Sequence, residues 1–154
     1  MRVSELVAHQ RVVSCGIGDT CNEAAKMMWE NDLGALPVLQ EDGTVTGMVT
    51  DRDICMACYT TGKAPNELRV SRHMSERLYC CTLSTTVSDA EVTMRKHQVR
   101  RLPVVDHPQR RHLVGMLSLA DIARKAEGER GAWLKEIPRE EVTDVLADIS
   151  RPRK

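Results

Sequence analysis

The stretch that decides the fold reads TCNEAAKMMWENDLGALPVLQEDGTVTGMVTDRDI at residues 20–54. Residues 86–122 repeat it as TVSDAEVTMRKHQVRRLPVVDHPQRRHLVGMLSLADI, with a short insertion ahead of Leu113. The match includes Leu36-Pro37-Val38 and Leu102-Pro103-Val104, which fall at the same place in the two copies. Self-similarity of this length indicates that one supersecondary unit is present twice in the chain.

Each copy predicts the same order of elements. In the first copy we expect strands at 12–15, 35–39 and 45–49, a helix after Thr20 and a second helix at 51–59. In the second copy we expect strands at 79–83, 102–105 and 113–117 and helices at 88–98 and 119–126. Thr20 and Glu23 have the spacing of a capping box, which starts a helix. Asp42-Gly43 is typical of a β-hairpin turn.

These elements predict an α/β (α+β) fold of two β-α-β-β-α repeats. In each repeat the strand-helix-strand connection should be a right-handed parallel crossover, and the hairpin adds an antiparallel strand to the same sheet. One repeat is too small to bury enough apolar surface alone, so we expect the two to pack around a pseudo-twofold axis with two equivalent clefts. We place the first repeat at 1–68, the second at 69–126 and a C-terminal helical extension at 127–154.

Composition and charge exclude several classes of protein. The 154 residues hold 22 basic and 22 acidic side chains, and this zero net charge argues against a basic nucleic-acid-binding protein. Phe is absent and aromatic residues make up 3% of the chain, which leaves little surface for stacking single-stranded bases. No apolar run is long enough to span a membrane and residues 1–20 show no cleavable leader, so we expect a cytoplasmic protein.

The sharpest repeated motif joins the last strand of each copy to the next helix. It reads GMVTDRD at 47–53 and GMLSLAD at 115–121, so that Thr50 or Ser118 precedes Asp53 or Asp121 by three residues. Taken alone, this spacing favours a helix capping box. The functional interpretation is that the aspartate accepts hydrogen bonds from two vicinal ribose hydroxyls, while the helix N-terminus favours an anion. The two interpretations are compatible, since a hydroxyl can cap an amide and also contact a ligand.

With this motif complete in both copies, the chain resembles the tandem cystathionine β-synthase (CBS) domain pair, or Bateman module. The resemblance covers residues 1 to about 126 and rests on the duplicated Leu-Pro-Val strand and the two hydroxyl-aspartate motifs. It implies two CBS-type repeats that bind adenosyl ligands, such as AMP, ADP, ATP or S-adenosylmethionine, in the clefts between them. No tightly bound cofactor is implied.

The resemblance also assigns ligand-binding residues. Thr50 with Asp53 would hold the ribose in one cleft, and Ser118 with Asp121 would hold it in the other. The adenine would lie against the aliphatic residues of the Leu-Pro segments, near Leu36 and Leu102, with backbone groups at Cys15 and Cys81 reading its edge.

Basic residues distinguish the two predicted clefts. Arg52 lies inside the first motif and could reach a phosphate, whereas the second copy has Ala120 at that place. Arg100 and Arg101 precede the second Leu-Pro segment, where relatives often carry phosphate-binding residues. The alternative for this pair is a solvated position at a strand edge. The asymmetry predicts two clefts that differ in affinity or in ligand.

Six cysteines, at 15, 21, 55, 58, 80 and 81, raise the question of a redox or metal site. In a chain without a leader we expect reduced thiols. Cys55 and Cys58 lie on one helical face, but zinc would need a second ligand pair, and Cys80 and Cys81 point to opposite faces of a strand. We therefore interpret the cysteines as small buried apolar residues and expect no metal site. No hydrolase triad, P-loop or dinucleotide fingerprint appears, so we expect no catalytic residues.

The C-terminal extension predicts one more helix. Gly128 and Gly131 end the preceding helix, and Pro138 opens the new one. Its apolar stripe has helical spacing and consists of Val142, Val145, Leu146 and Ile149. The stripe either docks on the same chain, with Trp133 and Leu134 as a clasp, or meets a second chain.

The leading hypothesis is a stand-alone regulatory module, not an enzyme, that binds an adenosyl ligand and signals by a conformational or dimer change. We expect a homodimer and a separate effector protein as partners, with no membrane or nucleic acid. Two alternatives remain open. One is a cysteine-based redox or metal-responsive stress protein, and the other is a ligand-free interaction scaffold.

Overall fold

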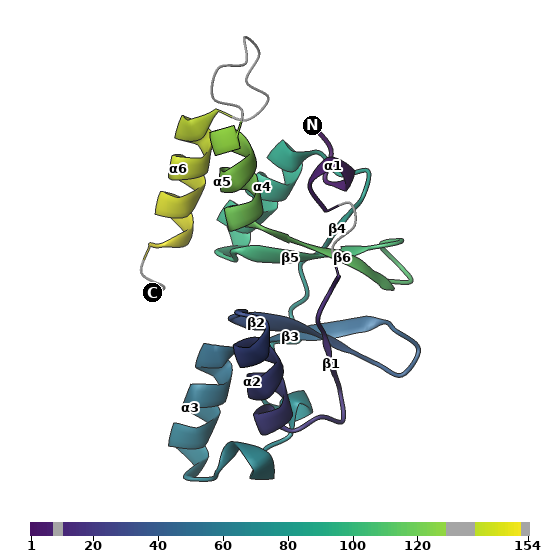
Figure 1. Cartoon of the computed structure of the whole chain (residues 1–154), viewed down its shortest axis with the longest axis vertical. Helices are drawn as coiled ribbons and strands as arrows, with labels where there is room; N and C mark the ends of the chain where they lie inside the picture. The colour runs from purple at the N-terminus through teal and green to yellow at the C-terminus, as the bar shows by residue number, and fades with distance from the viewer. Residues whose placement is uncertain (8–10, 129–137, 152–154) are drawn as a thin grey trace. The chain divides into compact units, whose positions relative to one another are not determined.

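Two three-stranded sheets, each with its own helices, build the chain (Figure 1). The computed structural model describes residues 1–7, 11–128 and 138–151. The first sheet and its helices consist of β1 (Cys15–Gly16), α2 (Cys21–Glu30), β2 (Ala35–Leu39), β3 (Val45–Thr50) and α3 (Asp51–Thr61). Two 3-10 turns follow, at Pro65–Glu67 and Val70–Arg72. The second set consists of β4 (Cys81–Thr82), α4 (Val87–His97), β5 (Arg101–Val105), β6 (Leu113–Ser118) and α5 (Leu119–Gly128).

Strand pairing confirms the predicted mixed α/β fold. In the first sheet β1 pairs with β2 in parallel through Cys15 and Val38, and β2 pairs with β3 antiparallel through Leu36 and Val49. The second sheet has the same order, with β4 parallel to β5. The strands predicted at 12–15 and 79–83 are shorter than expected: β1 and β4 are two residues long, and only Cys15 of the first predicted range and Cys81 and Thr82 of the second lie in them.

The contacts divide the chain into two compact units. The first-repeat unit consists of Val12–Leu78 and Arg110–Leu113, and the second-repeat unit consists of Met1–Arg11, Tyr79–Gln109 and Val114–Lys154. Each unit has its own apolar core. The repeat boundaries at 68 and 126 stay predictions, because these units divide the chain by contacts and not by sequence repeat.

The short helix α1 (Ser4–Val7) belongs to the second-repeat unit. Val3 N donates to Thr85 O at 2.9 Å, and Val87 N donates to Met1 O at 3.1 Å. The Val3 and Val7 side chains are buried in the core of that unit. The beginning of the chain is thus tied to residues that lie far along the sequence.

Side-chain caps start the helices where the sequence predicts them. Thr20 Oγ1 accepts from Glu23 N at 3.2 Å, and Thr20 N donates to Glu23 Oε2 at 2.7 Å, so the predicted capping box is confirmed. Thr86 Oγ1 accepts from Asp89 N at 3.1 Å in the second copy. These bonds satisfy amides that the first turn of a helix leaves without partners.

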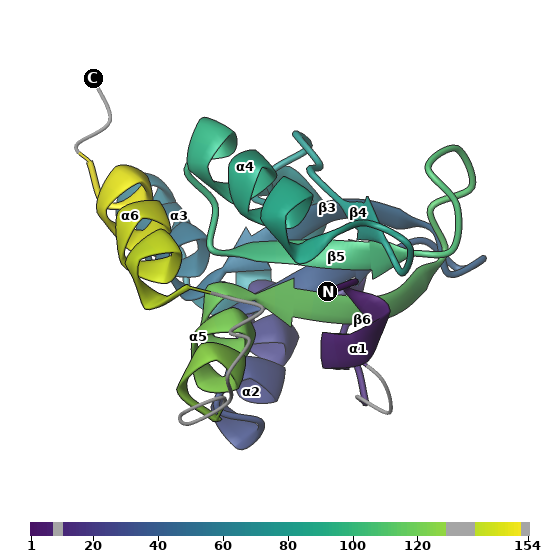
Figure 2. The ribbon, with the colours of Figure 1, turned by 90° about the horizontal axis from the view of Figure 1, so that it is seen from above.

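The helix α6 (Arg139–Ile149) packs on α4 and α5 within the second-repeat unit (Figures 1 and 2). Val145 and Ile149 are buried in the core of that unit, and Val142 packs against it. Leu146, the fourth residue of the predicted apolar stripe, is 47% exposed, so it does not take part in this packing as the other three do. Trp133 and Leu134, predicted as a clasp, lie outside the described residues.

Candidate functional site

The first hydroxyl-aspartate motif forms a complete capping box at the start of α3. Thr50 ends β3, and its Oγ1 accepts from Asp53 N at 3.1 Å. The Thr50 hydroxyl and amide both donate to Asp53 Oδ2, at 2.7 and 2.8 Å. Within the part of the chain that the structure describes, Oδ1 of Asp53 accepts no hydrogen bond. One oxygen of this half-buried carboxylate is therefore available to a ligand.

The second motif has the same box at the start of α5. Ser118 Oγ accepts from Asp121 N at 3.1 Å, and its hydroxyl and amide donate to Asp121 Oδ2 at 2.6 and 2.9 Å. Here the other oxygen, Oδ1, is bound by Arg124 one turn later, where the first copy has Met56. Because the Arg124 side chain is exposed, a ligand could displace this ion pair at little expense. Arg124 follows Asp121 by three residues on the same helix, and this spacing is the sequence signal that could have predicted the ion pair.

Backbone hydrogen bonds bring Arg100 and Arg101 beside the second motif. Leu119 N, in the first turn of α5, donates to Arg100 O at 2.9 Å. The first repeat makes the same link from Asp51 N to Gly34 O, at 3.2 Å. Arg100 is exposed and Arg101 is half-buried at the start of β5. The predicted neighbourhood of two arginines and the Ser118 box is thus present within one unit.

Charge differs between the two boxes. The first turn of α3 carries Asp51 and Asp53, and between them lies the exposed Arg52. The first turn of α5 has Asp121 as its acidic residue. Among the described residues, Arg52, Arg100 and Arg101 form no ion pair with a carboxylate. The second box therefore has the more positive surroundings.

Two of the sequence expectations need correction. Leu36 and Leu102, suggested as walls for an adenine, are fully buried and belong to the cores of their own units, so their side chains are not available to a ligand. Cys55 is exposed, not buried, because it lies on the outer face of α3.

The thiols at the start of the two sheets are buried as expected. Burial is the main cause that raises the pKa of Cys15 and of Cys81 to about 12, so both stay protonated. Burial also raises the pKa of Cys21. All six cysteines are free thiols, and the described residues contain no group of three or more His, Cys, Asp and Glu side chains that could hold a metal ion.

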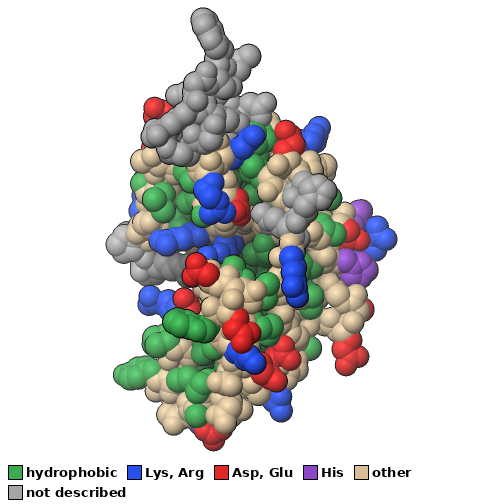
Figure 3. Space-filling model, viewed as in Figure 1, with side chains coloured by type: hydrophobic (Ala, Val, Ile, Leu, Met, Phe, Trp, Pro, Cys, Tyr) green, Lys and Arg blue, Asp and Glu red, His purple; other side chains and the backbone are tan. Residues whose placement is uncertain are grey.

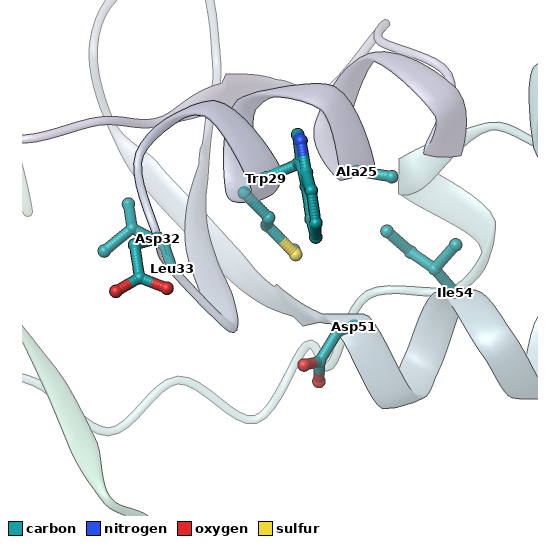
Figure 4. A pocket seen from close by; sticks show the side chains of 7 residues that line it. Ala25, Trp29, Asp32, Leu33, Asp51 and Ile54 are labelled. Atoms are coloured by element: carbon teal, nitrogen blue, oxygen red, sulfur yellow. The ribbon is translucent and has the colours of Figure 1, made fainter.

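A pocket that the sequence analysis missed lies between α2 and α3 (Figure 4). Its volume is about 250 Å³, and it is lined by Ala25, Met28, Trp29, Asp32, Leu33, Asp51 and Ile54. The Trp29 side chain is 88% exposed and stands at the edge of the pocket. A large aromatic residue at a helix position that faces solvent is the sequence signal that could have indicated this surface.

Comparison with known families decides the identity of the repeats. The family model of the CBS domain matches residues 3–59 and again 70–128. The chain belongs to the CBS domain family. Hypoxic response protein 1 of Mycobacterium tuberculosis is 33% identical over 124 residues, which are 80% of this chain and 85% of that protein. The CBS domain-containing protein YhcV of Bacillus subtilis is 37% identical over 113 residues, which are 73% of this chain and 77% of that protein.

Solved CBS domain pairs have the same fold. The structure of Hypoxic Response Protein I, described with two coordinated zinc ions, superposes with a TM-score of 0.71 at 32% identity, covering 80% of this chain and 98% of that one. The CBS domain pair of protein MJ0100, in complex with 5'-methylthioadenosine and S-adenosyl-L-methionine, has a TM-score of 0.74 at 23% identity, covering 84% and 98%. The predicted CBS-type fold is thereby confirmed. No helix among the described residues is both long and apolar enough to cross a membrane.

Proposed function

We propose that this CBS domain pair is a regulatory module, not an enzyme, that binds an adenosyl ligand at each of its two hydroxyl-aspartate boxes. Asp53 and Asp121 accept hydrogen bonds from the ribose hydroxyls, and Thr50 and Ser118 orient them. The observation that carries the proposal is the box itself: one carboxylate oxygen is held by the helix start, and the other is open on Asp53. A carboxylate held in this way can accept two hydroxyl donors without reorganising.

The two sites should prefer ligands of different charge. Arg100 and Arg101 lie beside the Ser118 box, which favours phosphates, so we assign AMP, ADP or ATP to this site. At the first box, Asp51 opposes an anion and Arg52 offsets it only in part. S-adenosylmethionine, which carries a sulfonium cation, is the better candidate there. The MJ0100 complex supports this choice to the extent that a protein of the same fold is described with S-adenosylmethionine and a second adenosyl compound.

The signal would pass to a separate effector protein through a change in conformation or in pairing of two chains. Trp29 and Tyr59 are 88% and 80% exposed on α2 and α3, where Figure 3 also shows hydrophobic side chains at the surface of the first repeat. We assign this face to a homodimer contact, because the equivalent face of the second repeat is covered by α6. A ligand shifts such an equilibrium only if it binds one arrangement more tightly. A cytoplasmic location fits these ligands.

Isothermal titration with AMP, ADP, ATP and S-adenosylmethionine tests the assignment. Asp53→Asn and Asp121→Asn should each weaken one site at least about tenfold, the equivalent of roughly 1.4 kcal/mol. Arg101→Gln should weaken ATP binding more than S-adenosylmethionine binding. Asp51→Asn is the matched control, since Asp51 lies in the same turn but outside the box: it should leave nucleotide binding at the second box unchanged and weaken S-adenosylmethionine binding at the first box less than Asp53→Asn does. If none of the four compounds binds, or if the double aspartate variant binds as the wild type does, the proposal fails and the ligand-free scaffold is favoured.

A second candidate function rests on the exposed thiol of Cys55, one helical turn from the half-buried Cys58. A relative is described with two coordinated zinc ions, which makes a metal-responsive role worth testing. Metal content and the number of free thiols with and without reductant decide it. Six free thiols and no zinc in the purified protein would contradict this function.

A further inference from the structure

Glu91 on α4 has an unusual environment for an acidic residue. Its exposed fraction is 2%, and among the residues that the structure describes no other charged side chain is buried. Its Oε1 has no hydrogen-bond partner in that part of the chain. An ionised carboxylate in such a place is strongly unfavourable, because it has lost water and gained too few donors.

The element that covers Glu91 is α6. Val145 and Ile149 of α6 share one core with Ala90 and Met94, which lie next to Glu91 along α4. Ser88 Oγ donates to Glu141 Oε1 at 3.5 Å, which places the Glu141 carboxyl over the same stretch of α4. Two carboxyl groups, one from each helix, therefore face each other at this contact.

The charges around this pair do not neutralise it. Burial and the neighbouring Glu141 raise the pKa of Glu91 to about 7, and Arg95 opposes the rise. Arg95 is itself engaged by Asp148 of α6, with 2.7 Å between Nη2 and Oδ2. Among the described residues, Glu141 from α6 and Arg95 from α4 are the charged groups that act on Glu91. Two facing carboxyls of this kind are most stable when they share one proton.

We propose that a proton shared by the Glu91 and Glu141 carboxyl groups holds α6 on α4, so that α6 docks more tightly at low pH and loosens as the pH rises. When α6 leaves, Glu91 returns to water and the surface of α4 and α5 is uncovered. That surface is the counterpart of the open face of α2 and α3 in the first repeat. The first repeat has Ala25 at the position of Glu91, so this proton-dependent contact belongs to the second repeat.

The direction of the pH dependence follows from proton linkage. The docked state binds the proton up to about pH 7, whereas an exposed glutamate loses it near the ordinary value of 4.5. The docking of α6 is therefore strongest below pH 4.5. It weakens as the pH rises from 4.5 to about 7, and it is constant above that range. Between pH 5.5 and pH 8.0 the docking equilibrium should weaken roughly twentyfold.

Amide hydrogen exchange of the full chain at these two pH values, corrected for the intrinsic exchange rate, measures the opening of α6 directly. In the wild type the opening constant of α6 should rise about twentyfold from the lower to the higher pH. Glu91→Gln keeps the shape of the side chain without its charge, and it should remove the pH dependence and keep α6 protected at pH 8.0. An opening constant that is equal at both pH values in the wild type, or that still varies in Glu91→Gln, overturns the proposal.

Two further variants make the test specific. Glu140→Gln removes a charge from the same turn of α6, but Glu140 is exposed, so the pH dependence of α6 opening should persist in this variant. If the pH dependence disappears in Glu140→Gln, the effect comes from the charge of the helix in general and the proposal is overturned. Glu141→Gln removes the repulsion and should raise the protection of α6 at pH 8.0. If Glu91→Gln does not fold, two measurements test the proposal in its place: the protection of α6 in Glu141→Gln, and the carbon-13 titration of the Glu91 carboxyl in the wild type. Titration near 7 supports the shared proton, and titration below 5 excludes it.

Discussion

The open face of α2 and α3 and the covered face of α4 and α5 are the same surface of one repeated fold, used in two ways. The pocket residues Ala25, Trp29 and Asp32 occupy the positions that hold Glu91, Arg95 and Gln98 in the second copy. The backbone is conserved between them, since Asp32 and Gln98 both have positive φ, at 53° and 52°.

All three second-copy residues serve the contact with α6. Arg95 pairs with Asp148, and Gln98 Nε2 donates to Asp148 O and Arg151 O at 3.4 and 3.3 Å. Glu91 lies beneath the same helix. At three matching positions, the second copy therefore carries side chains that contact α6, whereas the first copy carries residues that line an open pocket.

The largest expected effect is on the reactivity of the buried thiols, which should be equally low in the cores of the two repeats. Because the raised pKa leaves Cys15 and Cys81 protonated, their alkylation at pH 8 should be at least roughly a thousandfold slower than that of Cys55. Mass spectrometry of the iodoacetamide-treated native protein measures the rates. The unfolded thiols ionise near 9.0, so both residues should also lower the stability of the fold as the pH rises above that value. Rapid labelling of one of the two would show that the repeats differ already in their cores.

Displacing α6 should leave the α4 and α5 face of the second repeat uncovered, as the α2 and α3 face of the first repeat is. Val145 is fully buried, so Val145→Asp places a charge in the core and should lower the free energy of unfolding by about 2 to 3 kcal/mol. Leu146→Asp is the matched control on the exposed side of α6, and it should change stability by less than about 0.5 kcal/mol. Urea unfolding followed by circular dichroism measures both. Equal effects of the two substitutions would contradict the docked position of α6.

The two capping boxes offer a smaller and more symmetric comparison. Thr50→Ala and Ser118→Ala each remove an N-cap and should lower the free energy of unfolding by about 1 kcal/mol. Since the distances in the two boxes agree within a few tenths of an ångström, the two losses should be similar. Thermal unfolding without ligand measures this structural share, which has to be known before any loss of ligand binding is assigned to the same residues.

The smallest effect should come from exchanging the face residues themselves. Trp29→Arg gives the first repeat the arginine of the second, and because Trp29 is exposed it should change stability by less than about 0.5 kcal/mol. Its effect should instead appear in the sedimentation of the protein, where the weakened dimer dissociates at a higher protein concentration than the wild-type dimer does. A change in stability above 1 kcal/mol would show that Trp29 packs within its own unit.

Local signals made most of the fold predictable. Turn residues, caps and apolar runs placed β2 within its observed bounds and identified the start of every helix from α2 to α6 to within one residue, because these features depend on neighbours in sequence. The partner of α6 was not predictable, since the apolar stripe alone does not tell α4 from a second chain. Glu91 was missed for the same reason: its burial depends on α6, which lies far along the chain. The grouping of Arg101 with Ser118 was predictable because β5 and β6, which carry them, are consecutive strands of one sheet.

The placement of α1 has a consequence for biosynthesis. Residues 1–7 leave the ribosome well before Leu83 and Thr85, whose backbone carbonyls bind them. The first-repeat unit can complete its sheet in the meantime, whereas the second-repeat unit must wait for both early and late segments. A nascent chain halted between the repeats would therefore display one finished sheet, β1 to β3, and one unpaired leading segment.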